Sequence, residues 1–443
     1  MAESISNLQG LLFQLSEPIR KTILETPYTP PETGNISVKA VIDQLLPDKS
    51  SRPDSNFSDT RIRNSIKDFS LACALLSSAR SPTHELLSWI PLSVSILAES
   101  AFCELSKAHC VTFSETNARK IAELGLNYGM MTEENRLIAE LIPQVLPSLK
   151  DIIQESSVDK SDEVNEFSAA SARAPVGFAI VAAYQFRWFV TKIDYPHLGK
   201  LCALVIPCAL TAVDHWSTEV KGQGMISFIH IGKNVNAAEL GSYSDVILDA
   251  CCQNIASDDE IWHLVVEMSV VLVTCIQQSN PRSPWYTCLS VWFAVFERIL
   301  NEMLSHLDRQ PRNMDRRVAW LQHVEPLFNS IGLFLLAHFR RIFPLFFQWM
   351  GADDDETVIL VLKQIFTVIR LTWIRNTPYV DRLVDELSAL YKGASSKKSH
   401  EDIKRLVSEI LTLLQQCKGV QFEAAYDKYR DDPSFTDAVP SQS

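Results

Sequence analysis

Four consecutive acidic residues at positions 353–356, DDDE, are the side chains best suited to chemistry in this sequence. Carboxylates that cluster on one helix face can hold Mg²⁺ in an all-helical enzyme. Such a motif repeats its acids one helical turn apart, whereas the next position here is Thr357 and no second acidic motif at that spacing follows. Acids at a helix N-terminus are also stabilised by the helix dipole, by about 0.3–1 kcal/mol each. We therefore expect helix capping, and keep an all-α metal-dependent enzyme using Asp353–Asp355 as an alternative.

A second candidate is the segment 221–227, KGQGMIS, which contains part of a glycine-rich dinucleotide-binding pattern. That pattern requires a third glycine and a preceding β-strand, because the loop must lead from a strand to a helix. Neither condition is met, so we predict that the two glycines, Gly222 and Gly224, allow two helices to approach closely. The sequence contains no Cys-x-x-Cys, His-Glu-x-x-His, G-x-S-x-G or P-loop pattern. We expect no enzyme activity, no metal and no cofactor.

The composition of the 443 residues favours a large helical protein. Hydrophobic residues make up 47% of the chain, and only 14 glycines are present, too few for an architecture rich in β-hairpins. The formal charge of −12 argues against nucleic acid as the main ligand. Ten scattered cysteines in apolar helical segments indicate a reducing compartment, so we expect a cytoplasmic and/or nuclear location. The longest apolar segments are interrupted by charges, and we expect no membrane crossing.

The acidic residues lie between two strongly apolar predicted helices within residues 339–375. The second helix is apolar on nearly every side, and the spacing of its apolar residues predicts one fully buried face that ends at Trp373. Such a helix needs other helices on at least two sides, as in a row of stacked hairpins. From residue 176 to 416 the helical pattern is almost unbroken. The sequence therefore predicts an all-α fold, a HEAT/armadillo-like α-solenoid of stacked antiparallel helical hairpins.

Changes in composition predict five regions along the chain. Residues 1–60 form a helix and a Pro/Ser-rich linker, and residues 61–153 form the first helical repeats. Residues 154–172 are expected to be an acidic loop, with Ser156, Ser157 and Ser161 as candidate phosphorylation sites. Residues 173–421 form a C-terminal HEAT-like array, and residues 422–443 a polar tail.

Two predicted hairpins share an internal pattern of the HEAT type. In the first, Pro207 precedes Asp214 and Val220; in the second, Pro344 precedes Asp354 and Val358. The separations from proline to valine are 13 and 14 positions. We expect each proline to bend the outer helix, each acid to cap the inner helix and each valine to pack against the next repeat.

Aromatic and basic residues at 340–347 are candidates for partner binding. Phe343, Phe346 and Phe347 are interpreted mainly as core residues, with partner anchoring as the alternative, because aromatic residues dominate interface hot spots. Arg340 and Arg341, with Arg309, Arg312, Arg316 and Arg317, could form a basic ridge that binds an acidic segment.

Residues 342–375 resemble the C-terminal signature of the second Tel-two-interacting protein family. That signature combines a helix containing proline and tryptophan, an acidic turn, and a helix that ends in Thr-Trp-x-Arg; its members here are Pro344, Trp349, Asp354, Thr372, Trp373 and Arg375. A second segment, residues 206–240, is similar to the repeat of that family through Pro207, Asp214, Trp216, Lys221 and Gly224. Together the resemblance covers about residues 198–390.

The resemblance implies a non-catalytic scaffold in the Triple-T cochaperone complex. Its partners would be the first Tel-two-interacting protein, which is a larger HEAT-repeat protein, and the Tel-two protein. Through them it would support the ninety-kilodalton heat-shock chaperone in maturing phosphatidylinositol-3-kinase-related kinases. Another HEAT or armadillo adaptor, of the transport-receptor or phosphatase-scaffold kind, remains the alternative among binding proteins.

Overall fold

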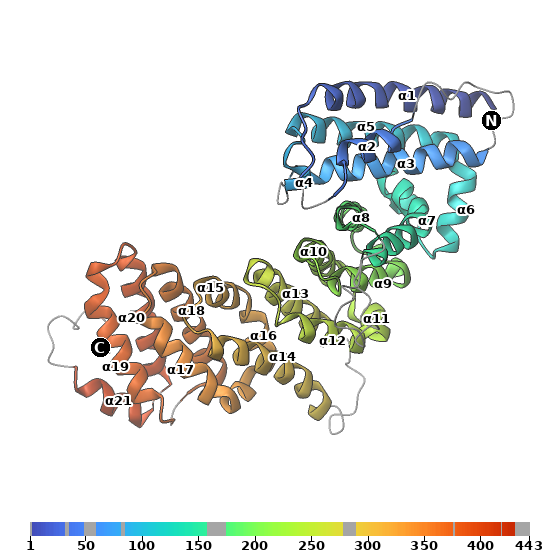
Figure 1. The fold of residues 1–443 in the computed structure, drawn as a ribbon. Coiled ribbons are helices and arrows are strands. Elements are labelled where there is room, and N and C mark those ends of the chain that lie inside the picture. The colour runs from blue at the N-terminus through green and yellow to red at the C-terminus, as the bar shows by residue number, and fades with distance from the viewer. Residues whose placement is uncertain are drawn as a thin grey trace, which may run out of the picture. The chain divides into compact units, whose positions relative to one another are not determined.

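A computed structural model (Figure 1) describes residues 2–31, 35–47, 59–80, 85–156, 174–277, 289–374, 377–417 and 419–429. Every regular element within these ranges is a helix, which confirms the predicted all-α class. The chain divides into two compact units, Met1–Ala250 and Cys251–Ser443, with the boundary inside helix α12 (Ser244–Asn254). Each unit consists of stacked antiparallel hairpins of the HEAT/armadillo type.

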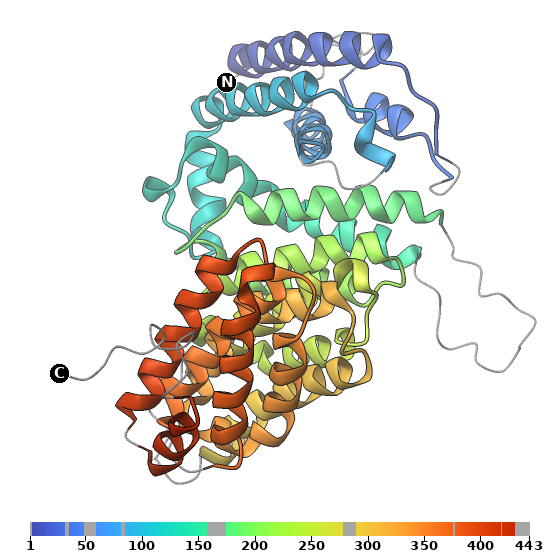
Figure 2. The same ribbon diagram turned by 90° about the vertical axis from the view of Figure 1, so that its left-hand side faces the viewer.

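The first unit has two rows of helices (Figure 2). One row consists of α5 (Leu92–Thr112), α7 (Glu133–Glu155) and α9 (Cys202–Val213), and the other of α3 (Asp59–Ser78), α8 (Val176–Thr191) and α10 (Thr218–Asn234). Helix α1 (Ala2–Glu25) packs on α5 and α3, α2 (Val38–Leu45) packs on α3, and α6 (Ser114–Glu123) packs on α7. Short elements complete this unit: α4 (Glu85–Ser88), η1 (Tyr128–Met130), η3 (Leu198–Leu201), α11 (Ala237–Leu240) and η4 (Gly241–Tyr243).

The second unit repeats this two-row arrangement. One row consists of α13 (Asp259–Gln277), α15 (Met314–His323), α18 (Asp355–Thr372) and α20 (His400–Gln416). The other contains α14 (Leu289–Arg309), α17 (Phe339–Met350), α19 (Val380–Gly393) and α21 (Val420–Asp427). Helix α16 (Glu325–Ile331) and the 3₁₀ helices η5 (Gly332–His338) and η6 (Ala394–Ser396) connect the rows. As the apolar pattern predicts, α18 has helices on several sides: α15, α16, α17 and α20.

The observed units differ from the predicted regions. Helices α1 and α2, expected to belong to a separate segment of residues 1–60, pack into the first unit. Helices α7 and α8 flank the expected boundary at 154–172 and pack closely on each other, because the apolar face of the amphipathic α7 meets α8, which is apolar on most sides. The expected loop itself lies mostly outside the described residues. Part of the expected polar tail is the helix α21, in which Phe422 and Ala425 are buried.

Trp373 does not continue the buried face of α18, which corrects the sequence interpretation. The helix ends at Thr372, and Trp373 takes a left-handed conformation (φ 47°) that leaves 55% of the residue exposed. Its backbone N–H still donates to the carbonyl of Ile369 at 2.9 Å. Periodicity predicts which face is buried but not where the helix stops, because a left-handed stop is usually marked by glycine and not by tryptophan.

One described segment, Glu325–Met350, has the length and apolar composition of a membrane-crossing helix. The structure divides it into α16, η5 and α17, and half of its most apolar window is buried within the second unit. Gly332 begins the break, with a φ of 57° that only glycine adopts readily. Burial in the helical stack accounts for only part of the apolar character of this segment, because half of that window is not buried.

Candidate interaction surfaces and polar clusters

The acidic turn between α17 and α18 caps α18 and connects it to two other helices. The Oδ1 atom of Asp354 accepts from the backbone N–H of Thr357 at 2.7 Å, which makes Asp354 the N-cap of α18. Its Oδ2 atom pairs with the guanidinium of Arg317 on α15. Asp355 accepts from the backbone N–H of Ser399, at the start of α20, at 2.8 Å. The turn therefore links α18 to the helix before it and the helix after it in its row.

The electrostatics of the turn agree with capping. Burial alone would raise the pKa of Asp354, but hydrogen bonds from Thr357 and Arg317 outweigh it and hold that pKa below its usual value. The Ser399 N–H, with a smaller effect from Lys397, also lowers the pKa of Asp355. No group of three or more His, Cys, Asp or Glu side chains within the described ranges is arranged to hold a metal ion. The carboxylates bind protein donors, as the capping interpretation predicts.

Replacing Asp354 with alanine should lower the free energy of unfolding by about 1–2 kcal/mol, because the helix cap is lost. The lowered pKa means that the contribution of Asp354 is complete above the pKa of an unfolded aspartate, about 3.9, and is lost as the pH falls through the folded value. Urea unfolding at pH 7 and at acid pH measures both effects. The exposed Asp353 is the matched control, and Asp353→Ala should change little. An equal loss in both variants, or heat of Mg²⁺ binding to the wild type, would favour the metal alternative.

Gly224 lies where α10 crosses α9 at close range. A Cβ atom added at Gly224 would lie 2.9 Å from the Cβ of Ala212 and 2.9 Å from the Cγ1 of Val213. These contacts are too short for carbon atoms, so the glycine is required for the approach of the two helices. The structure thus gives a packing reason for the glycine in the segment 221–227, which lies inside a helix and not in a strand–helix loop.

Gly224→Ala should destabilise the protein by up to about 2 kcal/mol. The steric cost of overpacking, about 1–3 kcal/mol, exceeds the gain of about 1 kcal/mol from helix propensity. Gly10 of α1 is the matched control, since nothing lies within 4 Å of its added Cβ, and Gly10→Ala should stabilise the protein by about 0.5–1 kcal/mol. Thermal unfolding of both variants measures the difference; a shift in the same direction would contradict the close-approach role.

The two internal repeats match only in part. Val220 and Val358 are both fully buried, and Pro207 and Pro344 both lie inside the first helix of their hairpin. Asp214, however, is an exposed residue at the end of α9 and does not cap α10, unlike its counterpart in the second hairpin. Asp214 lies three positions before Ser217, the N-cap residue of α10, whereas Asp354 is itself the N-cap residue of α18. Lys221 is half-buried within α10.

Trp216 closes a buried polar cluster where α7 ends. Its Nε1 donates to the carbonyl of Ser156 at 2.9 Å, and its ring stacks on His215. The Nδ1 of His215 accepts from the backbone N–H of Ser217 at 3.0 Å, so Nε2 carries the proton and donates to the Oγ of Ser156, also at 3.0 Å. Burial lowers the pKa of His215 to about 4. The cluster therefore anchors the end of α7 to the turn between α9 and α10.

Ser156 and His215 lie at the distance expected of a catalytic nucleophile and its general base. The position of the proton on His215, however, does not suit that role. A general base must accept the serine proton, whereas Nε2 of His215 already carries one. Ser156 is fully buried and donates to the carbonyl of Ile153 at 3.2 Å. The same burial corrects its interpretation as a phosphorylation site. Ser157 and Ser161 lie outside the described residues.

A buried charge cluster in the first unit is absent from the sequence predictions. Glu140 on α7 is 8% exposed and accepts from Arg63 of α3 at 2.5 Å and from Lys120 of α6 at 3.0 Å. His109 of α5 accepts on Nδ1 from Asn117, which places its Nε2 proton toward Glu140, 3.6 Å away. Burial lowers the pKa of His109 to about 4, so the ring is neutral. The sequence feature that could have indicated this cluster is Glu140 itself, the one acidic residue within the apolar segment 137–146.

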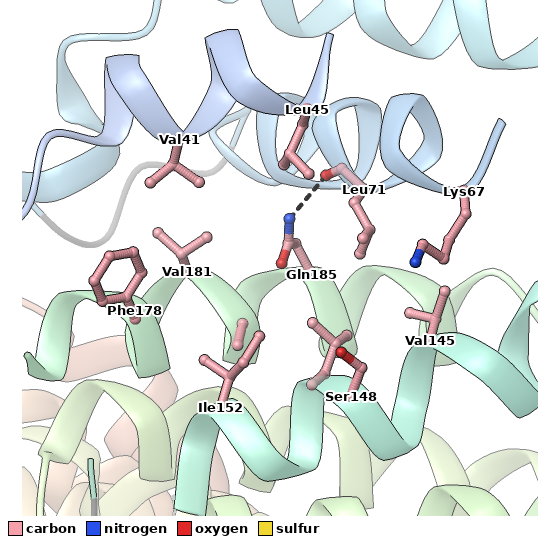
Figure 3. Close-up of a pocket in the computed structure, with 12 residues that line it drawn as sticks. Val41, Leu45, Lys67, Leu71, Val145, Ser148, Ile152, Phe178, Val181 and Gln185 are labelled. Carbon is pink, nitrogen blue, oxygen red and sulfur yellow. Dashed lines mark hydrogen bonds between the residues drawn. The ribbon is translucent and has the colours of Figure 1, made fainter. Parts of the chain in front are cut away.

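A small apolar groove lies beneath α2 (Figure 3). Val41 of α2 faces Val181 of α8, Leu45 lies opposite Gln185, and Phe178 lies at the end nearest the start of α8. Gln185 donates to the carbonyl of Leu71 at 3.0 Å and so is already bonded. The volume of about 130 Å³ is well below the roughly 300–1,000 Å³ typical of small-molecule sites. The groove is therefore an imperfection in packing between helices.

The predicted partner-binding residues are divided between core and surface. Phe343, Phe346 and Phe347 are at most 4% exposed, and Tyr379 stacks on Phe343 with ring centroids 5.0 Å apart. Their rings fill the space between α17 and its neighbours, which corrects the expectation that they could anchor a partner. Arg340, in contrast, is exposed.

Arg341 and its basic neighbours do not form one ridge. Arg341 bonds to Asn301, Ser305 and Asp308 of α14, and Arg316 pairs with Asp259 of α13. These guanidinium groups, like that of Arg317, join neighbouring helices of the stack. Trp349 is 1% exposed and donates to the carbonyl of Pro311 at 2.9 Å, while Thr372 is buried at the end of α18. Arg375 lies outside the described residues.

Stacked antiparallel hairpins, joined by buried side chains that link one hairpin to the next, define a helical-repeat protein of the HEAT/armadillo class. The chain is 55% identical over 439 residues to the Arabidopsis thaliana protein named Uncharacterized protein At2g39910, covering 98% of this chain and 95% of that one. It belongs to the family of this plant protein. No protein-family profile matches the chain.

A weaker similarity connects the chain to TELO2-interacting protein 2. It is 22% identical to the mouse protein over 254 residues and 23% identical to the human protein over 212 residues. These matches cover 55% and 47% of this chain, and 49% and 41% of the mouse and human proteins. The chain thus aligns with less than half the length of these relatives. The resemblance found in the sequence is borne out at this distant level.

Two solved structures of karyopherins align with most of the chain. Kap95p in a complex with RanGDP is 14% identical, with a TM-score of 0.48, over 87% of this chain and 50% of that one. Kap121p bound to Ste12p is 11% identical, with a TM-score of 0.31, over 93% of this chain and 47% of that one. Likeness at this level says nothing of function.

Proposed function

We propose that the protein is a non-catalytic scaffold that assembles with the TELO2 protein and its larger HEAT-repeat partner, the first Tel-two-interacting protein. The observation that carries the proposal is the distant similarity to TELO2-interacting protein 2, a protein named for its interaction with TELO2. The fold supports this role, since stacked hairpins offer long surfaces to protein partners. In that assembly the protein would act in the Triple-T cochaperone complex, with the ninety-kilodalton heat-shock chaperone, to stabilise phosphatidylinositol-3-kinase-related kinases in the cytoplasm or nucleus.

Co-purification from an extract of the source organism tests this proposal. A tagged chain should recover the TELO2 homologue and the first Tel-two-interacting homologue, identified by mass spectrometry. Loss of the protein should then lower the abundance of the related kinases without changing their messenger RNA. Recovery of neither homologue from an extract that contains both would overturn the proposal. Recovery of import cargoes or of a phosphatase instead would favour the adaptor alternative.

A further inference from the structure

Four exposed apolar side chains lie on η5 and at the end of α18, two elements that pack on each other. Leu333, Phe334 and Leu336 of η5 are 59%, 50% and 45% exposed, and Trp373 is 55% exposed. Helices η5 and α18 pack on each other, and α17 returns from η5 antiparallel to α18, so the end of α18 lies near η5. We call these four residues the η5–Trp373 patch. Monomeric proteins seldom expose so many large apolar side chains together, and such patches mark interaction sites.

The 3₁₀ geometry of η5 produces this exposure. Such a helix has three residues per turn, so positions three apart share one face. Leu335 and His338 share the inner face and are buried, which directs Leu333, Phe334 and Leu336 outward. The run Leu-Phe-Leu-Leu therefore has only one side chain in the core. The other three leave about half of their surface exposed.

The backbone of Trp373 indicates that its exposure has a purpose. A left-handed conformation costs a residue with a large side chain roughly 1–2 kcal/mol, and glycine at this position would avoid the cost. More than half of Trp373 is nevertheless exposed, so much of its apolar surface is available for contact. Strained residues of this kind are concentrated at functional sites. Tryptophan is also among the residues most enriched in interface hot spots.

The charges beside the patch select the kind of partner. Arg370, one helical turn before Trp373, is exposed, as is Arg340, one turn after Leu336. Glu325 is the one acid that pairs with either guanidinium in the described chain, at 3.9 Å from Arg370, with both side chains about half exposed. The patch is thus bordered by positive charge on a protein whose net charge is −12. An apolar surface with a basic border complements an amphipathic helix that carries acids beside its apolar face.

We infer that the η5–Trp373 patch is the docking surface for an acidic amphipathic helix of the helical-repeat partner. This inference rests on the proposed function and adds to it the surface and the chemistry of contact. The apolar face of the partner helix lies on Phe334 and Trp373, and its acidic residues face Arg340 and Arg370. The apolar residues contribute most of the binding free energy. The arginines increase the rate of association and orient the partner helix.

A binding titration with purified partners tests the surface. The triple variant Leu333→Ser/Phe334→Ser/Trp373→Ala should weaken the Kd for the first Tel-two-interacting homologue, alone or with TELO2, roughly thirtyfold or more. The pair Arg340→Glu/Arg370→Glu should slow association about tenfold at low salt, with a smaller effect as salt rises. The matched control is Leu92→Ser/Ile96→Ser on α5, where two leucine-like side chains are similarly exposed, at 57% and 51%.

The outcomes separate the inference from the proposed function. If the wild type binds neither homologue, the proposed function fails and the docking surface fails with it. If the wild type binds and the patch variants bind equally well, only the docking surface is overturned. If the control pair weakens binding as much as the patch variants do, the surface is likewise overturned. Unfolding curves of all variants should match the wild type, because every substituted side chain is exposed.

Discussion

Glu140→Ala should lower the free energy of unfolding by about 3–5 kcal/mol, among the largest effects of any single substitution outside the aromatic core. Glu140 neutralises Arg63, whose side chain is 17% exposed, and Lys120, whose side chain is 39% exposed. Without the carboxylate, the mostly buried guanidinium of Arg63 loses its counter-charge and lies near Lys120, and the Nε2 proton of His109 loses the carboxylate that it faces. Urea unfolding monitored by circular dichroism measures the loss.

A control and a rescue make this result specific. Glu104 pairs with Lys107 at the surface of α5, with both side chains 55% exposed, so Glu104→Ala should cost less than about 0.5 kcal/mol. Replacing both members of the buried pair, in Arg63→Met/Glu140→Leu, should cost less than Glu140→Ala alone, because a buried ion pair replaced by apolar groups is often neutral. Equal unfolding midpoints for Glu140→Ala and Glu104→Ala would show that the cluster contributes little.

Trp349→Ala should cost about 3–5 kcal/mol, because it removes one of three fully buried tryptophans from the described core of the second unit. The ring of Trp349 lies 5.9 Å from that of Trp320 in an edge-to-face arrangement, and its Nε1 donates to Pro311. The substitution leaves a cavity between α15 and α17 that helices fixed on several sides cannot close. Thermal unfolding of the full chain, with the second transition followed separately if the two units melt apart, measures the loss.

The same substitution at Trp373 is the control for this prediction. Trp373→Ala exchanges an exposed tryptophan in the same unit and should change stability by less than about 0.5 kcal/mol. Trp349→Phe keeps most of the apolar contacts and should lose less than Trp349→Ala. If Trp349→Ala and Trp373→Ala unfold alike, the assignment of one tryptophan to the core and the other to the surface is wrong.

The fold could be predicted from the sequence because apolar periodicity is strong in this chain. The bounds of α17 and α20, at 339–350 and 400–416, follow from it directly. Apolar periodicity does not predict which other helix packs against a given face. Phe343 and Trp373 are both aromatic residues at helical spacing, yet Phe343 is covered by Tyr379 and Trp373 stands beyond the last turn of α18.

The polar clusters were predictable only where their members are close in the sequence. Asp354 and Thr357 are three positions apart, so capping follows from local rules. Glu140 and Arg63 are 77 positions apart, and nothing in a single sequence says that α3 and α7 meet at these residues. The proline–acid–valine repeat illustrates the same limit, since Asp214 has the right type and order but lies at the end of α9.

The anchored end of α7 has a consequence for the length of the chain that follows it. The N–H of Ala174 donates to the carbonyl of Glu155 at 3.2 Å, and Ser156 is held by His215 and Trp216. The described residues on either side of 157–173, Ser156 and Ala174, therefore lie close together. The entropy of loop closure grows only slowly with length, by about 0.6 kcal/mol per doubling. A reporter domain or an affinity tag can therefore be inserted between Ser156 and Ala174 without disturbing the helical stack.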